Sequence, residues 1–212
     1  MKNIIVFDFD GTISNSSEST WKMFKKLREK YNLDNVKTKK QYLSLFKNNF
    51  FISIIELGIA PWNIPSFIKD IKKELELAEH KSKLFKEMPK LIKKLSKKNI
   101  IYIVTSNITS IVKKSLRENK VNVVKNVFGS DVSESKVKKL LMIKTRHPKD
   151  KIIYIGDTGG DIKEGKSADI LTIAVSWGYS SYNQLKKEKP FAIAKNPKQL
   201  DKIISELVKT NL

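Results

Sequence analysis

Two aspartates, Asp8 and Asp10, directly follow a short apolar run near the start of the chain. The run, residues 4–7, has the composition of a buried strand, and Gly11 and Thr12 then lead the chain away from it. Because burying an unpaired carboxylate costs several kcal/mol, two acids in this setting need a cation or several hydrogen-bond donors. A divalent cation would supply that compensation directly.

A second pair of acids, Asp157 and Asp161, follows another apolar run at residues 152–155. In an open parallel sheet the carboxyl ends of the strands line one crevice, where ligands bind, so we expect both pairs of acids to share one pocket. Oxygen ligands suit Mg²⁺, which completes its octahedral shell with water and phosphate. The sequence therefore predicts a magnesium site, and Mg²⁺ is the only cofactor that we expect.

Two further segments carry groups that suit a phosphate. Thr105, Ser106 and Asn107 follow the apolar run 100–104 and precede a predicted helix, where hydroxyls and free backbone N–H groups favour an anion. The same residue types are also ordinary helix caps. Lys136 could bring a compact positive charge into the pocket, with a surface lysine as the alternative because lysine is abundant in this chain.

The elements that must position these residues alternate between β-rich apolar runs and segments of helical periodicity. Such alternation is typical of a parallel sheet, and continuously apolar strands indicate that helices cover both of its faces. Strands are predicted at residues 4–7, 100–104, 121–127, 152–155 and 170–175. We therefore expect an α/β fold with a doubly wound, mostly parallel sheet, whose flank is closed by a C-terminal helix from Pro197 onward.

The first two predicted strands are separated by far more than the dozen or so residues that one crossover needs. Helical spacing of apolar residues recurs in this segment, which predicts a small helical insert. Pro61 and Pro65 are expected to break it near its middle, with Ser66 as a candidate cap for the following helix. The predicted division is a core formed by residues 1–15 and 84–212 and a helical domain formed by residues 16–83.

The chain carries 42 Lys and Arg against 22 Asp and Glu, a formal net charge of +20. Only Arg28, Arg117 and Arg146 are arginines, so the excess is almost entirely lysine. A basic chain can bind nucleic acid or anionic substrates, but sequence-reading sites favour the bidentate guanidinium of arginine. We interpret the charge, including pairs such as Lys138 and Lys139, as a solvated surface, and disfavour nucleic acid as a partner.

The 212 residues include no cysteine, which excludes disulfides, thiolate zinc sites and cysteine nucleophiles. The two histidines, His80 and His147, lack metal-ligand spacing. No apolar run reaches the roughly 18 residues that a membrane span needs, and Asp8 and Asp10 end the N-terminal apolar segment too early for a secretory signal. We expect a cytoplasmic protein without a membrane partner.

Over nearly its whole length the chain resembles the haloacid dehalogenase-like hydrolases. The resemblance rests on four elements in the family's order: Asp8-x-Asp10-Gly11-Thr12, Thr105 at a strand end, Lys136, and Gly156-Asp157-x-x-x-Asp161. The helical insert is similar to the cap of that family, whose core is Rossmann-like. Trp177-Gly178-Tyr179 is similar to a sequence in its phosphoglycolate phosphatase-like branch.

The resemblance implies a role for each candidate residue. Asp8 would attack phosphorus to form an aspartyl-phosphate, while Asp10 would protonate the leaving alcohol and then deprotonate the hydrolytic water. Mg²⁺ would be held by Asp8, the Asp10 carbonyl and Asp157, with Asp161 acting directly or through water. The implied phosphate-binding residues are Gly11, Thr12, Thr105, Ser106, Asn107 and Lys136, of which Thr105 and Lys136 are also catalytic.

These roles predict a Mg²⁺-dependent phosphatase that acts on a small phosphorylated metabolite. A sugar-phosphate mutase, which transfers the phosphoryl group between two positions, would use the same core residues. The charge of +20 keeps open a nucleic-acid-binding protein or a nucleic-acid terminal phosphatase. A non-catalytic scaffold is disfavoured because all four carboxylates are kept. The motifs identify neither the alcohol that is released nor the oligomeric state.

Overall fold

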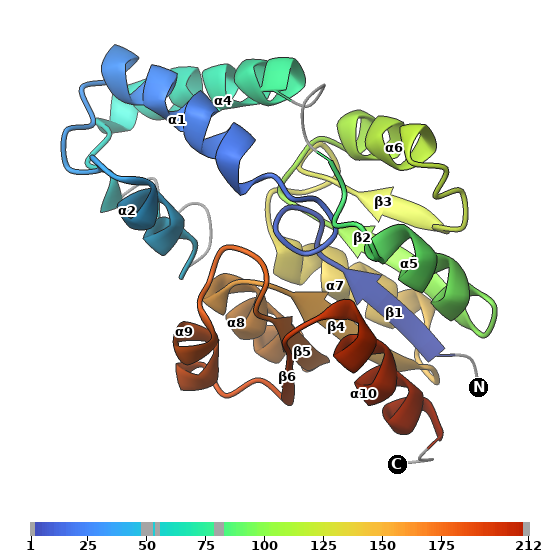
Figure 1. Cartoon of the computed structure of the whole chain (residues 1–212). Coiled ribbons are helices and arrows are strands. Elements are labelled where there is room, and N and C mark those ends of the chain that lie inside the picture. Colours follow the sequence, from blue (N-terminus) through green and yellow to red (C-terminus); the bar gives the residue numbers. More distant parts are fainter. Residues whose placement is uncertain (1–2, 48–52, 54–55, 79–82, 210–212) are drawn as a thin grey trace.

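The computed structural model describes residues 3–47, 53, 56–78 and 83–209. Its central feature is a six-stranded sheet with the order β3-β2-β1-β4-β5-β6, in which every neighbouring pair is parallel (Figure 1). The strands are β1 (Asn3–Phe7), β2 (Asn99–Val104), β3 (Asn126–Phe128), β4 (Lys151–Gly156), β5 (Leu171–Val175) and β6 (Ala192–Ala194). The predicted parallel α/β sheet is confirmed.

Strand β1 lies in the middle of the sheet because both of its faces are apolar. Ile5 is fully buried and pairs with Ile101 of β2 on one side and Ile153 of β4 on the other. The chain builds outward from β1 to β2 and β3, then returns to the other side of β1 to build β4, β5 and β6. The strand order thus reverses between β1 and β4, and in such sheets ligands bind outside the carboxyl ends at this point.

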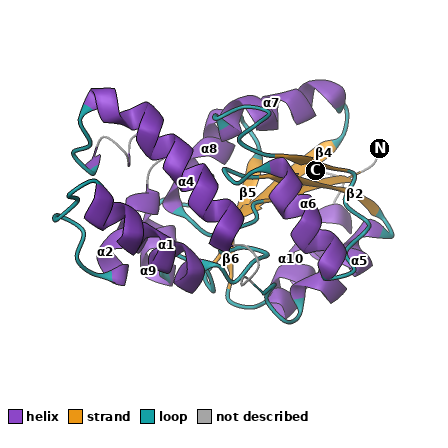
Figure 2. Cartoon of the chain, turned by 90° about the horizontal axis from the view of Figure 1, so that it is seen from above, coloured by secondary structure: helices purple, strands orange, loops and turns teal. Residues whose placement is uncertain are grey.

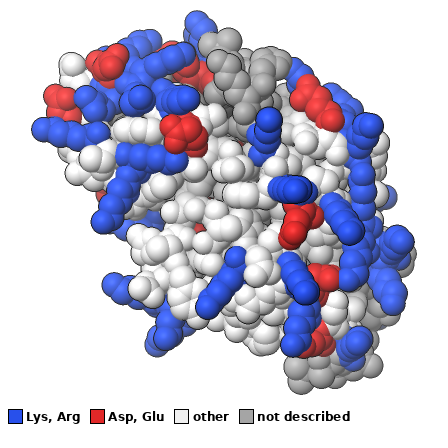
Figure 3. Space-filling model, viewed as in Figure 1, with Lys and Arg blue, Asp and Glu red and all other residues white. Residues whose placement is uncertain are grey.

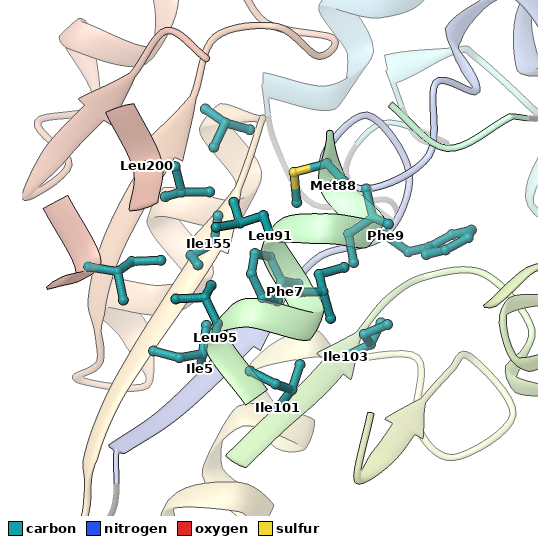
Figure 4. Close-up of a cluster of buried hydrophobic side chains, with 14 of the residues drawn as sticks. Ile5, Phe7, Phe9, Met88, Leu91, Leu95, Ile101, Ile103, Ile155 and Leu200 are labelled. Atoms are coloured by element: carbon teal, nitrogen blue, oxygen red, sulfur yellow. The ribbon is translucent and has the colours of Figure 1, made fainter. Parts of the chain in front are cut away.

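Helices cover both faces of the sheet (Figure 2). One layer contains α5 (Met88–Ser96), α6 (Thr109–Glu118) and α10 (Pro197–Lys209). The other contains α7 (Lys136–Arg146) and α8 (Gly159–Ser167), with α9 (Tyr182–Lys187) beside α8. In Figure 4, Phe7 of β1 packs among Met88, Leu91 and Leu95 of α5 and Leu200 of α10, which fixes the direction in which β1 enters the site.

Between β1 and β2 the chain forms a helical insert with a hydrophobic core of its own (Figure 1). The insert contains α1 (Ser17–Lys30), α2 (Lys39–Ser44), η1 (Leu45–Lys47), η2 (Pro61–Asn63) and α4 (Ile64–Ala78). The segment that enters the insert and the segment that leaves it lie side by side. Asn15 N–H donates to the carbonyl of Lys83 at 2.9 Å, and Ser14 forms a β-bridge with Leu84. This pairing supports our proposal that the domain boundaries lie at residues 16 and 83.

Three details of the predicted elements differ from the structure. Residues 121–125 form a loop in place of the start of a strand, because the N–H of Val121 donates to Leu116 O at the end of α6. Pro65 lies in the first turn of α4, where the missing N–H is tolerated, so it does not break that helix and Ser66 does not cap it. The sequence analysis missed β6, which has only three residues.

The C-terminal helix predicted from Pro197 is confirmed as α10. Its buried residues, Leu200, Ile204 and Leu207, lie against the same hydrophobic cluster as α5. Across the described residues, no helix has both the length and the apolar character that a bilayer crossing requires.

Candidate active site

The carboxyl ends of β1 and β4 bring three buried aspartates together. Asp8 follows β1, and its backbone N–H donates to Ile155 O of β4 at 2.8 Å. Asp157 follows β4, and Asp161 lies in the first turn of α8. Each of the three offers a carboxylate oxygen within 4.8 Å of the others, and all three side chains are buried.

Lys136 is the first residue of α7, and its side chain joins two of these acids. Its Nζ lies 2.7 Å from Asp8 Oδ1 and 2.7 Å from Asp161 Oδ1, with 11% of the lysine side chain exposed. Burial alone would lower the pKa of Lys136, but the carboxylates of Asp161 and Asp8 raise it well above its ordinary value. The lysine is therefore an ammonium held at the acidic cluster.

Asp161 is the most fully hydrogen-bonded of the three acids. Besides Lys136, its Oδ1 accepts from Tyr154 OH at 2.7 Å, and its Oδ2 accepts from the N–H and Oγ1 of Thr158 at 3.0 and 2.6 Å. Thr158 also caps α8, accepting from the N–H of Asp161. Burial acts to raise the pKa of Asp161, but Lys136 and these donors bring it below its ordinary value. Asp161 is thus an ionised anchor for Lys136.

Asp157 is held by two donors from opposite sides. Thr12 Oγ1 donates to its Oδ1 at 2.9 Å, and Tyr179 N–H donates to its Oδ2 at 2.7 Å. Two glycines leave room for the carboxylate. A Cβ on Gly11, which has φ +81°, would lie 2.2 Å from Asp157 Oδ2, and a Cβ on Gly178 would lie 2.3 Å from it.

The charges of this cluster test whether a divalent cation fits. Burial raises the pKa of Asp8 well above its ordinary value, and burial followed by repulsion from Asp161 raises that of Asp157 to about 7. Lys136 gives one positive charge against three carboxylates. Asp8 Oδ2 accepts no hydrogen bond from the described residues. A divalent cation that takes oxygen ligands therefore fits between Asp8 and Asp157, with Asp161 beside it.

Asp10 is in a different environment from Asp8. Its Oδ2 accepts from Asn107 Nδ2 at 3.0 Å, and the side chain is half-buried. Burial raises its pKa, although hydrogen bonds from Ser16 and Asn107 oppose that shift. Asp10 can consequently hold a proton, whereas the neighbouring Asp8 is paired with Lys136.

The segment after β2 lies next to these acids. Thr105, Ser106 and Asn107 line the same cavity as Asp8 and Lys136, and Thr105 Oγ1 accepts from Asn107 N–H at 3.0 Å. The N-terminus of α6 follows at Thr109. Of the other residues predicted to bind phosphate, Gly11 and Thr12 do not line this cavity; they position Asp157.

The sequence analysis missed Lys139. The prediction that Lys138 and Lys139 both lie on a solvated face is wrong for Lys139, which is fully buried and donates through Nζ to Thr105 O at 2.6 Å and Gly129 O at 3.2 Å. Burial, followed by repulsion from Lys136, lowers its pKa to about 8. Helical periodicity could have revealed it, because Lys139 lies one turn from Lys136 on the inner side of α7.

Aromatic residues of the loop after β5 connect the insert to the site. Trp177 Nε1 donates to Thr12 O at 3.1 Å, and Tyr179 OH shares a hydrogen bond with Ser16 Oγ at 2.9 Å. The Tyr179 ring contacts Phe46 of η1 with 5.0 Å between centroids. The loop after β5 therefore contacts Thr12, which orients Asp157, and it also contacts the insert.

His147, the one histidine among the described residues, lies outside the cavity that contains Asp8. His147 follows α7, where its ring nitrogens lie 3.1 Å from Tyr102 OH and 3.0 Å from Asp150 Oδ2. His80 lies outside the described residues.

Comparisons with known proteins find relatives that cover nearly the whole chain. A phosphoglycolate phosphatase from Synechococcus elongatus is 19% identical over 209 residues, which cover 97% of this chain and 98% of the relative. A predicted phosphatase from Clostridium acetobutylicum superposes with a TM-score of 0.84 at 20% identity, covering 97% of this chain and 99% of the other. A haloacid dehalogenase-like family hydrolase from Streptococcus pneumoniae superposes with a TM-score of 0.80 at 20% identity, covering 97% and 98%.

The similarities to solved structures establish the fold alone. Family membership is established by a sequence pattern that matches most of the chain. The pattern described as haloacid dehalogenase-like hydrolase matches residues 5–175, a range that contains Asp8, Lys136 and Asp161. The chain belongs to the haloacid dehalogenase-like hydrolase family.

Proposed function

We propose that this protein is a Mg²⁺-dependent phosphatase that hydrolyses a small phosphomonoester through an aspartyl-phosphate on Asp8. The observation that carries the proposal is the clustering of Asp8, Asp157 and Asp161 at the switch point of the sheet, with the ammonium group of Lys136 paired to Asp8 and Asp161. The Synechococcus elongatus relative, a phosphoglycolate phosphatase, supports the same reaction class.

Asp8 is the nucleophile in this account. Its Oδ1 accepts a hydrogen bond from Lys136. One oxygen of this carboxylate attacks phosphorus, and the other would be a ligand of the cation. In the first step a bond forms between the attacking oxygen and phosphorus while the bond from phosphorus to the alcohol oxygen breaks. Phosphoryl transfer needs chiefly alignment and charge neutralisation, and a cation held by Asp8 and Asp157 would add the positive charge that the phosphoryl oxygens require.

Asp10 moves the proton in both steps. Its raised pKa allows it to give a proton to the departing alkoxide in the first step. In the second step it takes a proton from water as that water attacks phosphorus, and the bond between phosphorus and Asp8 breaks. Inorganic phosphate leaves and the Asp8 carboxylate is restored, so the two steps balance.

Residues around Asp8 position the phosphoryl group. Lys136 lies beside the attacking carboxylate, and Thr105, Ser106 and Asn107, which precede α6, line the neighbouring wall. Backbone N–H groups at the start of a helix and hydroxyls favour an anion. Lys139 holds the carbonyl of Thr105 and so fixes this wall from behind.

The test is turnover of a phosphomonoester panel with Mg²⁺ and with a chelator, comparing the wild type with Asp8→Asn. The proposal predicts turnover that needs Mg²⁺ and falls at least about a thousandfold in the variant. Asp34→Asn, at an exposed position of the insert, is the matched control and should keep wild-type turnover. Equal turnover by the wild type and Asp8→Asn on every active ester would overturn the assignment.

A further inference from the structure

The cavity that contains Asp8 continues away from the sheet into the helical insert. Its interior volume is about 160 Å³, and the cavity is partly open to solvent. One end is lined by Asp8, Asp10 and Lys136, and the other by side chains from α1, α2, η1 and α4. A phosphoryl group placed at Asp8 would therefore direct its alcohol portion toward the insert.

The insert end of the cavity is apolar. Among the described residues, its lining includes Met23, Phe24, Leu27, Leu45 and Phe67, together with other apolar side chains, and no charged residue. Three hydroxyls are present there. Thr20 Oγ1 donates to Ser16 O at 3.0 Å, Ser53 Oγ donates to Leu45 O, and the third belongs to the buried Tyr42.

This lack of charge stands out in a chain in which 42 of 212 residues are Lys or Arg. Figure 3 shows the basic side chains of the insert on its outer surface. At the surface of the insert, Lys26, Lys30 and Lys39 form ion pairs with Glu74, Asp70 and Glu18, respectively. The insert thus exposes its lysines to solvent and none of those described lines the cavity.

At the sheet end the charges do not favour a second anion on the substrate. Lys136 is the one cation among the described lining residues, and it is already paired with Asp8 and Asp161. Asp10 and Glu164 add further carboxyl groups to the lining. A substrate carboxylate close to the phosphoryl group would therefore be desolvated near acids, without an unpaired lysine or arginine among the described lining residues to bind it.

We propose that the alcohol released from this cavity is uncharged and apolar, either aliphatic or aromatic, and that a carboxylate-bearing ester such as phosphoglycolate is a poor substrate. This inference rests on the proposed phosphatase function. Burial of apolar surface favours each methylene that enters the cavity by about fourfold in binding. The insert selects the substrate by excluding charge.

The test compares two esters of the same shape, isobutyl phosphate and 2-phosphoglycolate, in which two methyl groups replace two carboxylate oxygens. With the wild-type protein and Mg²⁺, we expect kcat/KM for isobutyl phosphate to exceed that for 2-phosphoglycolate at least tenfold. Along methyl, ethyl, propyl and butyl phosphate it should rise about fourfold per methylene. Preference for 2-phosphoglycolate, or no dependence on chain length, would overturn the inference while leaving the phosphatase proposal intact.

Two variants test whether the insert causes the preference for isobutyl phosphate over 2-phosphoglycolate. Leu45 lines the cavity, whereas Leu43, also half-buried in the insert, does not. Leu45→Lys should shift the ratio of the two kcat/KM values at least tenfold toward 2-phosphoglycolate, and Leu43→Lys should leave the ratio unchanged. An unchanged ratio in a folded Leu45→Lys protein would contradict the inference.

Binding separates failure of this inference from failure of the proposed function. Isobutylphosphonate and phosphonoacetate, which cannot be hydrolysed at a phosphate ester bond, are titrated into the wild-type protein by calorimetry. Binding of isobutylphosphonate at least tenfold tighter than that of phosphonoacetate would support the inference, whether or not any ester is turned over. A lack of turnover on every ester would reject only the phosphatase proposal. Equal or tighter binding of phosphonoacetate overturns the inference.

Discussion

The Nζ of Lys136 lies 2.7 Å from Oδ1 of Asp8, joining the first turn of α7 to the end of β1. The same ammonium contacts Asp161 at the start of α8, so a single charge links three elements. In the proposed reaction this charge holds the nucleophile in place and lies beside the phosphoryl oxygens.

Replacement of Lys136 by Met should therefore reduce kcat by about a hundredfold to a thousandfold, because it removes a charge directed at the transferring group. Lys138→Met is the matched control, since Lys138 lies two residues away on the exposed side of α7. Steady-state kinetics on the best ester of the panel gives the comparison. Loss of less than tenfold in a folded Lys136→Met protein would argue against its role.

Gly11 provides a test of how Asp157 is positioned. Gly11→Ala places a methyl group 2.2 Å from Asp157 Oδ2 and also strains a backbone with φ +81°. Gly58→Ala introduces comparable backbone strain at φ +74° with no atom within 4 Å, so it isolates the strain. Each should lose about 1 kcal/mol of stability from backbone strain.

Only Gly11→Ala should also lose activity, by at least about a hundredfold, and bind Mg²⁺ more weakly. Urea denaturation gives the stabilities, and calorimetric titration with Mg²⁺ gives the affinity. Equal kcat in the two variants would show that the contact with Asp157 is unimportant.

The hydroxyl of Tyr154 should contribute to stability through Asp161. Tyr154→Phe removes a donor to a buried carboxylate, which costs about 1–3 kcal/mol. Tyr182→Phe removes a hydroxyl from an exposed tyrosine and should change the free energy of unfolding by less than about 0.5 kcal/mol. Chemical denaturation of both variants measures the difference, and similar values would contradict the anchoring role of Tyr154.

Lys139 makes a prediction about pH. Its pKa is about 8 in the folded protein and 10.5 in an exposed lysine, so between these values the unfolded chain keeps a proton that the folded chain has released. Stability relative to Lys139→Met should therefore rise with pH across this window, by about 3 kcal/mol when complete. The difference in unfolding free energy, measured at pH 7, 9 and 10.5, tests this prediction. A difference that stays constant or falls would refute it.

Much of the fold follows from local sequence patterns. Strands β1, β2, β4 and β5 are continuously apolar and end at residues that break the pattern, so their positions and their parallel pairing in one sheet could be predicted, although their order in the sheet was not. Strand β6 has three residues, which is too short for periodicity to identify, and only the end of the strand predicted at residues 121–127 falls within the three-residue β3. Their pairing is imposed by the neighbouring strands β2 and β5.

The candidate site could be predicted where its residues end strands. Asp8 and Asp157 follow β1 and β4 directly, and their proximity follows from the topology of the sheet. The partners that orient these acids, such as Tyr154 and Tyr179, come from packing between elements. Thr158 is different, because its spacing to Asp161 is that of a helix capping box and was readable in the sequence.

The most direct test is to identify the residue that carries phosphate during turnover. Wild-type protein is mixed with Mg²⁺ and its best phosphomonoester, quenched within the first turnover, reduced with borohydride and digested for mass spectrometry. The account predicts that the acyl phosphate, and hence the reduced side chain, is found at Asp8 and is absent from Asp8→Asn. Reduction at Asp10, or full turnover by Asp8→Asn without any modified residue, would contradict it.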